Sequence, residues 1–405
     1  MQPLTVCMFS NLYPPVVSGS STQTSALSRE LSRRGHKVLV ITAHIDPSTP
    51  EYEEIDGVSV YRLPALRLPK LEIALNFPWL NYTFTPANLR RVESILRQHK
   101  PDVIHLHNHM FDLGPTAVLM SKRTRIPLVI TLHTVIRHSK WIYNSLLYPA
   151  DRVLLRRLIV DRSDQLICPD LNVKSYAREA FGRHDAVIVP YGIDLPTLPE
   201  NGQVKQIQAT YGLNGKRIIL SLGHVHDIRN RHDLIAAMPD VLRIFPNAVL
   251  FIVGAVSTSS PLQLARSLGV EHAVVFSGPL PHQVVPGLMA MADLEAHWLN
   301  QEEPERTSLG IASLEAMAAG KVVLAAANPN TYGIGILKSG ENIIITERGK
   351  PDRLGRTIVD LLSDQDKCQV IGQRAQKTIN DHFSWDKVCE QTLEVYRQVI
   401  QGSTR

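Results

Sequence analysis

Short, nearly continuous apolar runs recur along this chain, and the first is followed by a small polar loop and a helical pattern. That run covers 5–10, the helical pattern covers 22–34, and the next apolar run starts at Lys37. Strands that are apolar on both sides are typical of parallel sheets, so β-loop-α-β units are predicted. Ser18 and Gly19 lie in the first loop, at the edge where doubly wound folds bind ligands. They are candidate contacts to a phosphate or sugar, or simple turn residues.

The alternation continues on both sides of a break at 191–202, a segment rich in proline and glycine that is typical of an interdomain hinge. The further apolar runs are 103–107, 127–133, 165–169, 186–190, 218–223, 248–254, 274–278, 294–298 and 341–346. The sequence therefore predicts two doubly wound α/β domains, at residues 1–195 and 203–382. An amphipathic helix, at about 385–401, closes the chain.

Composition narrows the class of protein. The chain has 405 residues, 44% of them hydrophobic. No apolar run approaches the ~18 residues that would span a bilayer. The first residues have neither a basic leader nor a small-residue cleavage site, so we interpret them as a buried strand and not as a signal peptide. The cysteines are too scattered for a zinc site, which fits a reducing compartment. We expect a cytoplasmic protein.

The formal net charge of +5 is unevenly distributed. Residues 1–195 contain 23 basic and 17 acidic residues, and the rest contains 20 and 21. A basic N-terminal half favours an anionic partner, such as a phosphorylated or lipid-linked acceptor or the inner face of a membrane. The basic clusters 122–125 and 152–157 are explained more simply as solvated surface. Segment 62–84 is explained more simply by core packing than by a role as a cleft cover or a bilayer contact. No nucleic-acid motif accompanies these charges, so we expect no nucleic-acid partner.

His107 and His133 end two predicted strands. The ends of parallel strands lie side by side, so both histidines can face one cleft. His133 is then either a hydrogen-bond donor to a substrate or a structural histidine. A metal site would have to use His105, His107, His109 and His133. No carboxylate or cysteine cluster joins them, and we expect no metal.

The stretch 302–320 indicates a polar loop that enters a helix and is followed by a buried strand. Ser308 is the expected N-cap, and Gly320 suits the left-handed position after the last turn. Gly310 has no Cβ to keep an anion away from the free amides at the helix start. Glu315 is positioned to accept hydrogen bonds from ribose or sugar hydroxyls, with a solvated helix glutamate as the alternative.

Two polar side chains follow the predicted strand 218–223. His224 and Arg229 lie just beyond the end of this strand, where they could meet a diphosphate. A guanidinium group is suited to forked contacts with phosphate oxygens. Ordinary surface arginine is an equal alternative for Arg229.

Taken together, these features resemble glycosyltransferase family 4, a large retaining, metal-independent group with the GT-B fold that uses nucleotide-activated sugars. The resemblance rests on the order and spacing of 14–19, 34–38, 102–107, 191–194, Gly223, 251–254, 292–293, 309–318 and 383–385. It implies two Rossmann-like domains facing across a cleft, with the acceptor bound by the first and the nucleotide sugar by the second. It also implies that the last helix crosses back to the N-terminal domain.

Position by position, the resemblance implies catalytic roles for three residues. Glu315 matches the second glutamate of the family's E-x7-E motif, which holds the donor ribose. Arg229 stands where the family has a diphosphate-binding lysine, and His133 matches the histidine below the sugar. The implied donor site comprises Gly19, Gly223, His224, Arg229, Gly254, Glu305, Thr307, Ser308, Leu309, Gly310 and Glu315. The implied acceptor site comprises Ser18 and His107.

The sequence departs from the family pattern at three of these positions. Thr307 stands in place of the first motif glutamate, His224 in place of a diphosphate arginine, and Ser18 in place of the first glycine of a Gly-Gly loop. Glu303 or Glu305 would be close enough to substitute for the lost carboxylate. Recognition of the donor sugar is expected to be decided there.

The implied reaction is front-face sugar transfer to a hydroxyl group of a glycolipid, a polysaccharide precursor or a small molecule. It needs stabilisation of the departing diphosphate and of an oxocarbenium-like sugar. Other GT-B reactions, such as phosphorolysis or epimerisation, remain alternatives. A catalytically silent sugar-nucleotide binding protein is a third, because of the changes at Thr307 and His224.

Overall fold

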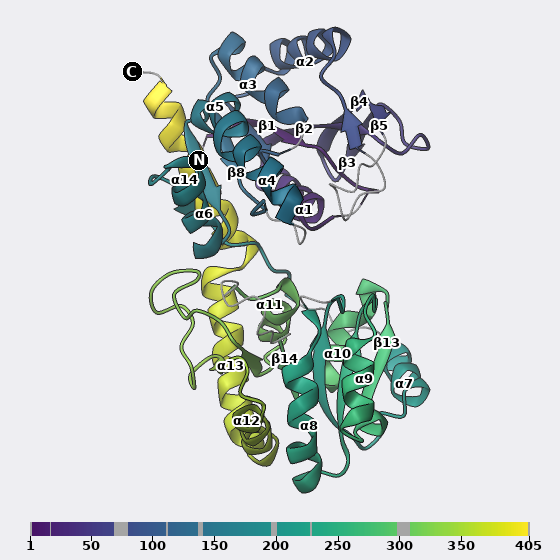
Figure 1. Cartoon of the computed structure of the whole chain (residues 1–405). Coiled ribbons are helices and arrows are strands. Elements are labelled where there is room, and N and C mark those ends of the chain that lie inside the picture. Colours follow the sequence, from purple (N-terminus) through teal and green to yellow (C-terminus); the bar gives the residue numbers. More distant parts are fainter. Residues whose placement is uncertain are drawn as a thin grey trace. The chain divides into compact units, whose positions relative to one another are not determined.

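The structure is a computed structural model that describes residues 2–16, 18–68, 80–110, 112–136, 141–195, 201–226, 229–297 and 308–403. The chain forms two compact units. The N-terminal unit comprises Met1–Gly192 and Trp385–Arg405, and the C-terminal unit comprises Ile193–Ser384. Each unit is built on its own largely parallel sheet with helices packed against it (Figure 1).

The sheet of the N-terminal unit has eight described strands in the order β10-β9-β8-β7-β1-β2-β4-β3, and among them β3 alone is antiparallel to its neighbour. The strands are β1 (Thr5–Ser10), β2 (Lys37–His44), β3 (Tyr52–Ile55), β4 (Val58–Pro64), β7 (Val103–His107), β8 (Leu128–Thr131), β9 (Gln165–Cys168) and β10 (Val187–Ile188). A separate antiparallel pair is formed by β5 (Leu66–Leu68) and β6 (Leu80–Tyr82).

Helices cover both faces of this sheet. They are α1 (Gly19–Arg33), α2 (Pro86–His99), α3 (Leu113–Thr124), α4 (Trp141–Pro149), α5 (Arg156–Leu158), α6 (Leu171–Phe181) and α14 (Trp385–Ser403). Alternate residues of β1 explain the two layers, because successive strand side chains point to opposite faces. Cys7 and Phe9 pack with residues of α2, α3 and α6, whereas Val6 and Met8 pack with residues of α1 and α14. The C-terminal helix thus completes one face of the N-terminal core.

Helix α1 begins at Gly19, earlier than the predicted start at Thr22. Ser18 is its N-cap: the Ser18 hydroxyl accepts from the amide of Ser21 at 3.1 Å, and the Ser21 hydroxyl accepts from the amide of Ser18 at 2.7 Å. This reciprocal pair satisfies amides that the helix leaves without partners. The spacing of apolar residues does not reveal such caps, so the sequence-based prediction placed the start of α1 three residues too far along the chain.

The C-terminal unit has six described strands, all parallel, in the order β13-β12-β11-β14-β15-β16. They are β11 (Arg217–Leu222), β12 (Ala248–Val253), β13 (Val274–Gly278), β14 (Leu294–Ala296), β15 (Val323–Ala325) and β16 (Ile344–Ile345). The helices are α7 (Asn201–Thr210), α8 (His232–Ile244), α9 (Ser260–Ser267), α10 (Val285–Met291), α11 (Ile311–Ala318), α12 (Pro351–Ser363) and α13 (Gln365–His382). Two buried apolar clusters lie on the two faces of this sheet.

Helix α11 ends as the sequence predicts. Gly320 has a φ of +71° and its amide donates to Met317, while the amide of Lys321 donates to Ala316. This pair of bonds is a Schellman ending. A Cβ at Gly372 of α13 would lie 1.9 Å from the carbonyl oxygen of Gly320, so the two backbones meet without a side chain between them. Glycine at both positions therefore allows the end of α11 to pack closely against α13.

Several predicted strands are shorter in the structure. The run 127–133 ends as a strand at Thr131, 294–298 ends at Ala296, and 341–346 retains two strand residues. Apolar composition continues past the point where pairing stops, because these segments still cross the interior. Within the described residues, no helix is both long enough and apolar enough to span a bilayer.

Candidate active site

In the C-terminal unit, the loops after β11 and β12 expose glycine backbone. Gly223 has a φ of +116° and Gly254 a φ of +146°, a region that side chains other than glycine rarely adopt. A Cβ on Gly254 would lie 2.4 Å from the carbonyl oxygen of Gly223. The two predicted donor-site glycines are thus in direct contact at the carboxyl edge of the sheet.

The described part of the loop after β11 is shaped by Arg231, which is fully buried. Its guanidinium donates to the carbonyl oxygens of Leu222, Gly223, His224 and Arg229 and to the hydroxyl of Ser221. Burial, and then the charge of Arg229, lower the pKa of Arg231 to about 9, so the group stays charged at neutral pH. The sequence offered no signal for this role, because an arginine in a polar loop is usually at the surface.

Arg229 is half-buried in a short turn of the same loop, and its amide donates to His226 at 2.8 Å. Its charge contributes to lowering the pKa of His297, whose main cause is burial and whose value is about 3. Nε2 of this neutral imidazole accepts from the amide of Gly310 at 3.1 Å. The Arg229 cation and the start of α11 are therefore close to the same histidine, which was not among the predicted site residues.

The start of α11 differs from the prediction that Ser308 is the N-cap. Gly310 is the N-cap, and the helix begins at Ile311. The Ser308 hydroxyl contacts that of Thr331 at 3.0 Å, and the Leu309 carbonyl accepts from the Tyr332 hydroxyl at 3.3 Å. Leu309 is buried, so the chain stays extended until it has crossed the core.

Because α11 starts later than predicted, a different set of backbone amides is available to bind an anion. The Gly310 amide is used by His297. The amides of Ile311 and Ala312, in the first turn, have no intrahelical acceptor by the geometry of any α-helix. They are the groups of α11 best placed for an anion.

Glu315 is not the isolated surface glutamate of the alternative interpretation. Its side chain is 24% exposed and its Oε1 lies 3.3 Å from Nε2 of His282. The hydrogen bond to Glu315 raises the pKa of His282. His282 is a neighbour that the sequence did not indicate.

Glu295, on β14, is a buried acid. Burial raises the pKa of Glu295 to about 8, and contacts with Ser313 and the charge of Arg231 only partly oppose this shift. Glu295 is therefore largely protonated at neutral pH. It lies between the Arg231 loop and α11 without adding a full negative charge where a diphosphate would bind.

In the N-terminal unit, three aromatic side chains form a hydrogen-bonded chain. Nδ1 of His107 lies 3.1 Å from Nε2 of His133, and Nδ1 of His133 lies 3.0 Å from the hydroxyl of Tyr191. Burial lowers the pKa of His133 to about 4 and that of His107 well below its usual value, so both rings are neutral. The structure thus brings His107 and His133 together, as strand order predicts.

Both ring nitrogens of His133 are occupied by protein partners in this arrangement. Nε2 of His107, in contrast, is buried and has no hydrogen-bond partner among the described residues. The His107 side chain lines a cavity of about 30 Å³ that is also lined by His105, Thr131 and Trp385. A space of this size admits a water or a single hydroxyl group. The open hydrogen-bonding group of the cluster is therefore on His107.

The remaining histidines of the predicted cluster have structural partners. His105 bonds the hydroxyls of Tyr396 and Thr131, both at 2.7 Å, and His109 lies 2.9 Å from Asp151. Among the described residues, no group of three or more histidine, cysteine or acidic side chains is arranged to hold a metal ion.

The loop residues Ser18 and Gly19 have separate roles in the structure. The Ser18 hydroxyl caps α1, whereas a Cβ at Gly19 would meet no heavy atom within 4 Å. Space for a ligand therefore exists at Gly19. Glu305 and Thr307, on which donor choice was predicted to depend, lie outside the described residues.

Comparisons with known proteins agree with this architecture. The Anabaena protein Alr3699/HepE, solved in complex with UDP and glucose, has a TM-score of 0.68 at 18% identity over 98% of this chain and all of its own. The two parallel-sheet units define the GT-B fold.

The family follows from the sequence comparisons. The description "Glycosyltransferase Family 4" matches residues 17–196, and "Glycosyl transferases group 1" matches residues 203–378. The two descriptions match the N-terminal and C-terminal halves of the chain in turn, so the chain belongs to glycosyltransferase family 4. A glycosyltransferase of Methanocaldococcus jannaschii is 28% identical over 96% of this chain and 97% of its own. A glycogen synthase of Mycobacterium tuberculosis is 27% identical over 98% of this chain and 95% of its own.

Proposed function

We propose that this glycosyltransferase moves a sugar from a nucleoside-diphosphate donor to a hydroxyl acceptor, with retention of anomeric configuration and without a metal ion. One observation carries the proposal: Arg229, the Gly223–Gly254 contact and the start of α11 lie at one edge of the C-terminal sheet. The charge of Arg229 contributes to lowering the pKa of His297, and the His297 ring accepts a hydrogen bond from the amide of the N-cap Gly310. A cation and helix amides close to one another suit a diphosphate. The complex of the similar Anabaena protein with UDP supports the same ligand class.

In the proposed reaction, the bond between the anomeric carbon and the diphosphate oxygen breaks as the bond to the acceptor oxygen forms on the same face. The acceptor proton passes to the departing phosphate oxygen. Arg229 and the first amides of α11 stabilise the charge that develops on the diphosphate. Glu315 holds the donor ribose. No protein nucleophile is required.

On the acceptor side, we assign the direct contact to His107 and the supporting role to His133. His107 has the open Nε2 beside a hydroxyl-sized cavity, whereas His133 is held between His107 and Tyr191. A neutral imidazole there acts as a hydrogen-bonding group. The sequence analysis also expected His107 in the acceptor site, but it gave His133 a direct role where this assignment gives it a supporting one.

Replacing Tyr191 by phenylalanine should lower kcat about 10-fold while leaving the KM for the donor nearly unchanged, because His133 loses the hydroxyl that holds its ring in place. Steady-state kinetics would measure both constants. Tyr61→Phe is a matched control, since the Tyr61 hydroxyl bonds His99 at 2.8 Å elsewhere in the same unit. Equal kcat values for Tyr191→Phe and the wild type would remove Tyr191 from this role.

Replacing Glu315 by glutamine tests the donor site directly. We expect a loss of nucleotide-sugar affinity on the order of 1 to 3 kcal/mol, from the loss of a charge-assisted hydrogen bond. Calorimetric titration with UDP, GDP and ADP and their sugars would measure it. Glu271→Gln, at an exposed position of the same unit, is the control. An unchanged dissociation constant for the Glu315 variant would exclude the ribose contact.

A further inference from the structure

One helical segment of the N-terminal unit turns its apolar side chains outward. It consists of α4, a π-helical stretch at Ala150–Leu155, and α5 (Figure 1). Its exposed large apolar residues are Trp141, Ile142, Leu146, Val153, Leu154 and Leu158, each between 52% and 78% exposed. They are six of the sixteen exposed large apolar residues in the described part of the chain. Exposed apolar side chains concentrated in this way indicate an interaction surface.

The exposed apolar side chains include pairs that are neighbours on a helix surface. Ile142 and Leu146 are four residues apart, as are Leu154 and Leu158, and residues at that spacing lie on the same face of a helix. Asp151 and Ile159, in contrast, are buried. The segment thus has a buried face through Asp151 and an apolar face open to solvent.

Polar contacts fix this orientation. Oδ1 of Asp151 lies 2.9 Å from Nε2 of His109, and its other oxygen accepts from the hydroxyl of Tyr176. Rotation of the helix to bury its apolar face would carry the Asp151 carboxylate away from both partners. Leaving those groups unpaired in the interior would cost free energy, so the apolar face stays outward.

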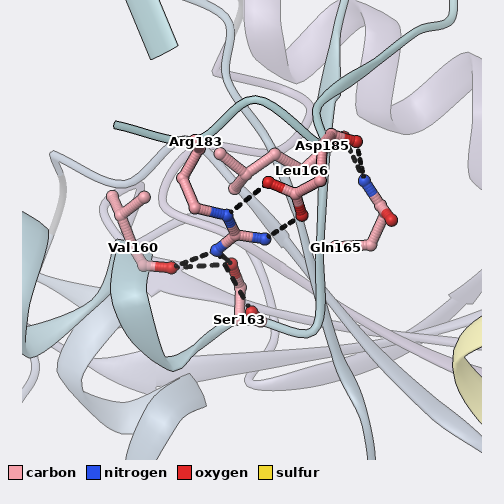
Figure 2. A network of polar contacts seen from close by, with 6 residues as sticks. All are labelled: Val160, Ser163, Gln165, Leu166, Arg183 and Asp185. Carbon is pink, nitrogen blue, oxygen red and sulfur yellow. Dashed lines mark hydrogen bonds and ion pairs between the residues drawn. The ribbon is translucent and has the colours of Figure 1, made fainter. Parts of the chain in front are cut away.

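The chain that leaves the segment is held as well. Figure 2 shows Arg183 donating to the carbonyl oxygens of Val160 and Ser163, at 2.9 and 3.2 Å, while pairing with Asp185. Gln165 donates to the carbonyl of Asp185 at 2.6 Å. The segment is therefore anchored at its middle and at its C-terminal end.

Positive charge accompanies the apolar side chains. Arg152 and Arg157 are exposed, and the guanidinium of Arg152 lies 4.6 Å from the centre of the Tyr148 ring. Between Trp141 and Leu158 the sole acidic residue is Asp151, which is buried. The exposed face of the segment is thus both apolar and cationic.

We propose that residues 141–158 form a docking surface for an anionic lipid bilayer. The apolar side chains enter the boundary between headgroups and acyl chains, and Arg152 and Arg157 contact lipid phosphates. Tryptophan favours this boundary. The surface does not depend on the proposed transfer reaction. It agrees with the expectation that the basic N-terminal half favours an anionic partner, whereas the sequence analysis explained the 152–157 cluster more simply as solvated surface.

The test uses the full chain and sedimentation with vesicles of phosphatidylcholine, with or without phosphatidylglycerol. The wild type should bind the anionic vesicles, and rising salt should weaken the binding. Substituting both Ile142→Ser and Leu146→Ser should reduce the partition coefficient at least about tenfold. Ile334→Ser is the control, because Ile334 is 93% exposed in the other unit. Arg152→Gln with Arg157→Gln should weaken binding to anionic vesicles and flatten its salt dependence.

Two results would overturn the proposal. One is equal vesicle binding by the wild type and the Ile142/Leu146 variant, with thermal unfolding showing both to be folded. The other is an absence of vesicle binding together with self-association in sedimentation velocity that the same substitutions abolish. The latter would identify a second copy of the chain as the occupant of the surface.

Discussion

Replacing Arg229 by alanine is expected to lower kcat for sugar transfer roughly 100- to 1,000-fold, the usual effect of removing one group that stabilises transition-state charge. Negative charge grows on the diphosphate as the glycosidic bond breaks, and the charge of Arg229 acts on His297, whose ring accepts from the Gly310 amide. The interaction strengthens in the transition state, so kcat and kcat/KM should fall together. Steady-state kinetics with saturating acceptor would measure both.

The loop itself should survive this substitution. Arg231 holds the backbone carbonyl of residue 229 at 2.6 Å, and alanine retains that carbonyl. Arg229→Lys keeps the charge and should restore much of the rate. Arg243→Ala is a suitable control, because the Arg243 side chain is 74% exposed on α8. A near-normal rate for Arg229→Ala would remove the leaving-group role.

Lowering the pH from about 7.5 to about 5 should reduce the unfolding free energy of the N-terminal unit by on the order of 5 kcal/mol. Burial lowers the pKa of His105 to about 3 and that of His133 to about 4, and it lowers the pKa of His107 well below 6.5. The unfolded chain therefore binds protons below pH ~6.5 that the folded unit cannot accept. Because the folded-state pKa values are lowered, the unfolding free energy is unchanged above pH ~6.5 and falls as the pH is lowered below it.

Urea unfolding of the full chain at the two pH values, followed by fluorescence, would measure this loss. His107→Gln removes one titrating ring, and its pH-dependent loss should be about a third smaller than that of the wild type. His184→Gln is the control, because His184 is exposed in the same unit. Equal stability of the wild type at both pH values would show that the buried rings are not held neutral.

The central strands could be predicted from sequence because both of their faces are buried. Thr5–Ser10 and Val103–His107 have the predicted bounds. Tyr52–Ile55 was missed because it is a short, charged edge strand, and edge strands need no continuous apolar run. Helix starts depended on caps such as Ser18 and on the buried Leu309, neither of which apolar spacing reveals.

Site residues could be predicted from sequence where they lie at the carboxyl ends of strands. His107 and His133 follow neighbouring strands, and Gly223 and Gly254 do the same in the other unit, so topology alone brings each pair together. Arg231, Glu295 and His297 could not be predicted in the same way. Arg231 is buried among carbonyl groups of its own loop, and Glu295 and His297 are buried in their uncharged forms, whereas charged side chains usually face water.

The central claim is that the protein consumes a nucleoside-diphosphate sugar. The most direct measurement is incubation of the full-length protein with UDP-, GDP- and ADP-sugars, with release of the nucleoside diphosphate followed by proton NMR. We expect one nucleotide class to be consumed, slowly with water and faster with an acceptor, and the transferred sugar to keep the anomeric configuration of the donor. Failure to bind or consume any donor in the panel, by protein shown to be folded, would contradict the proposed function.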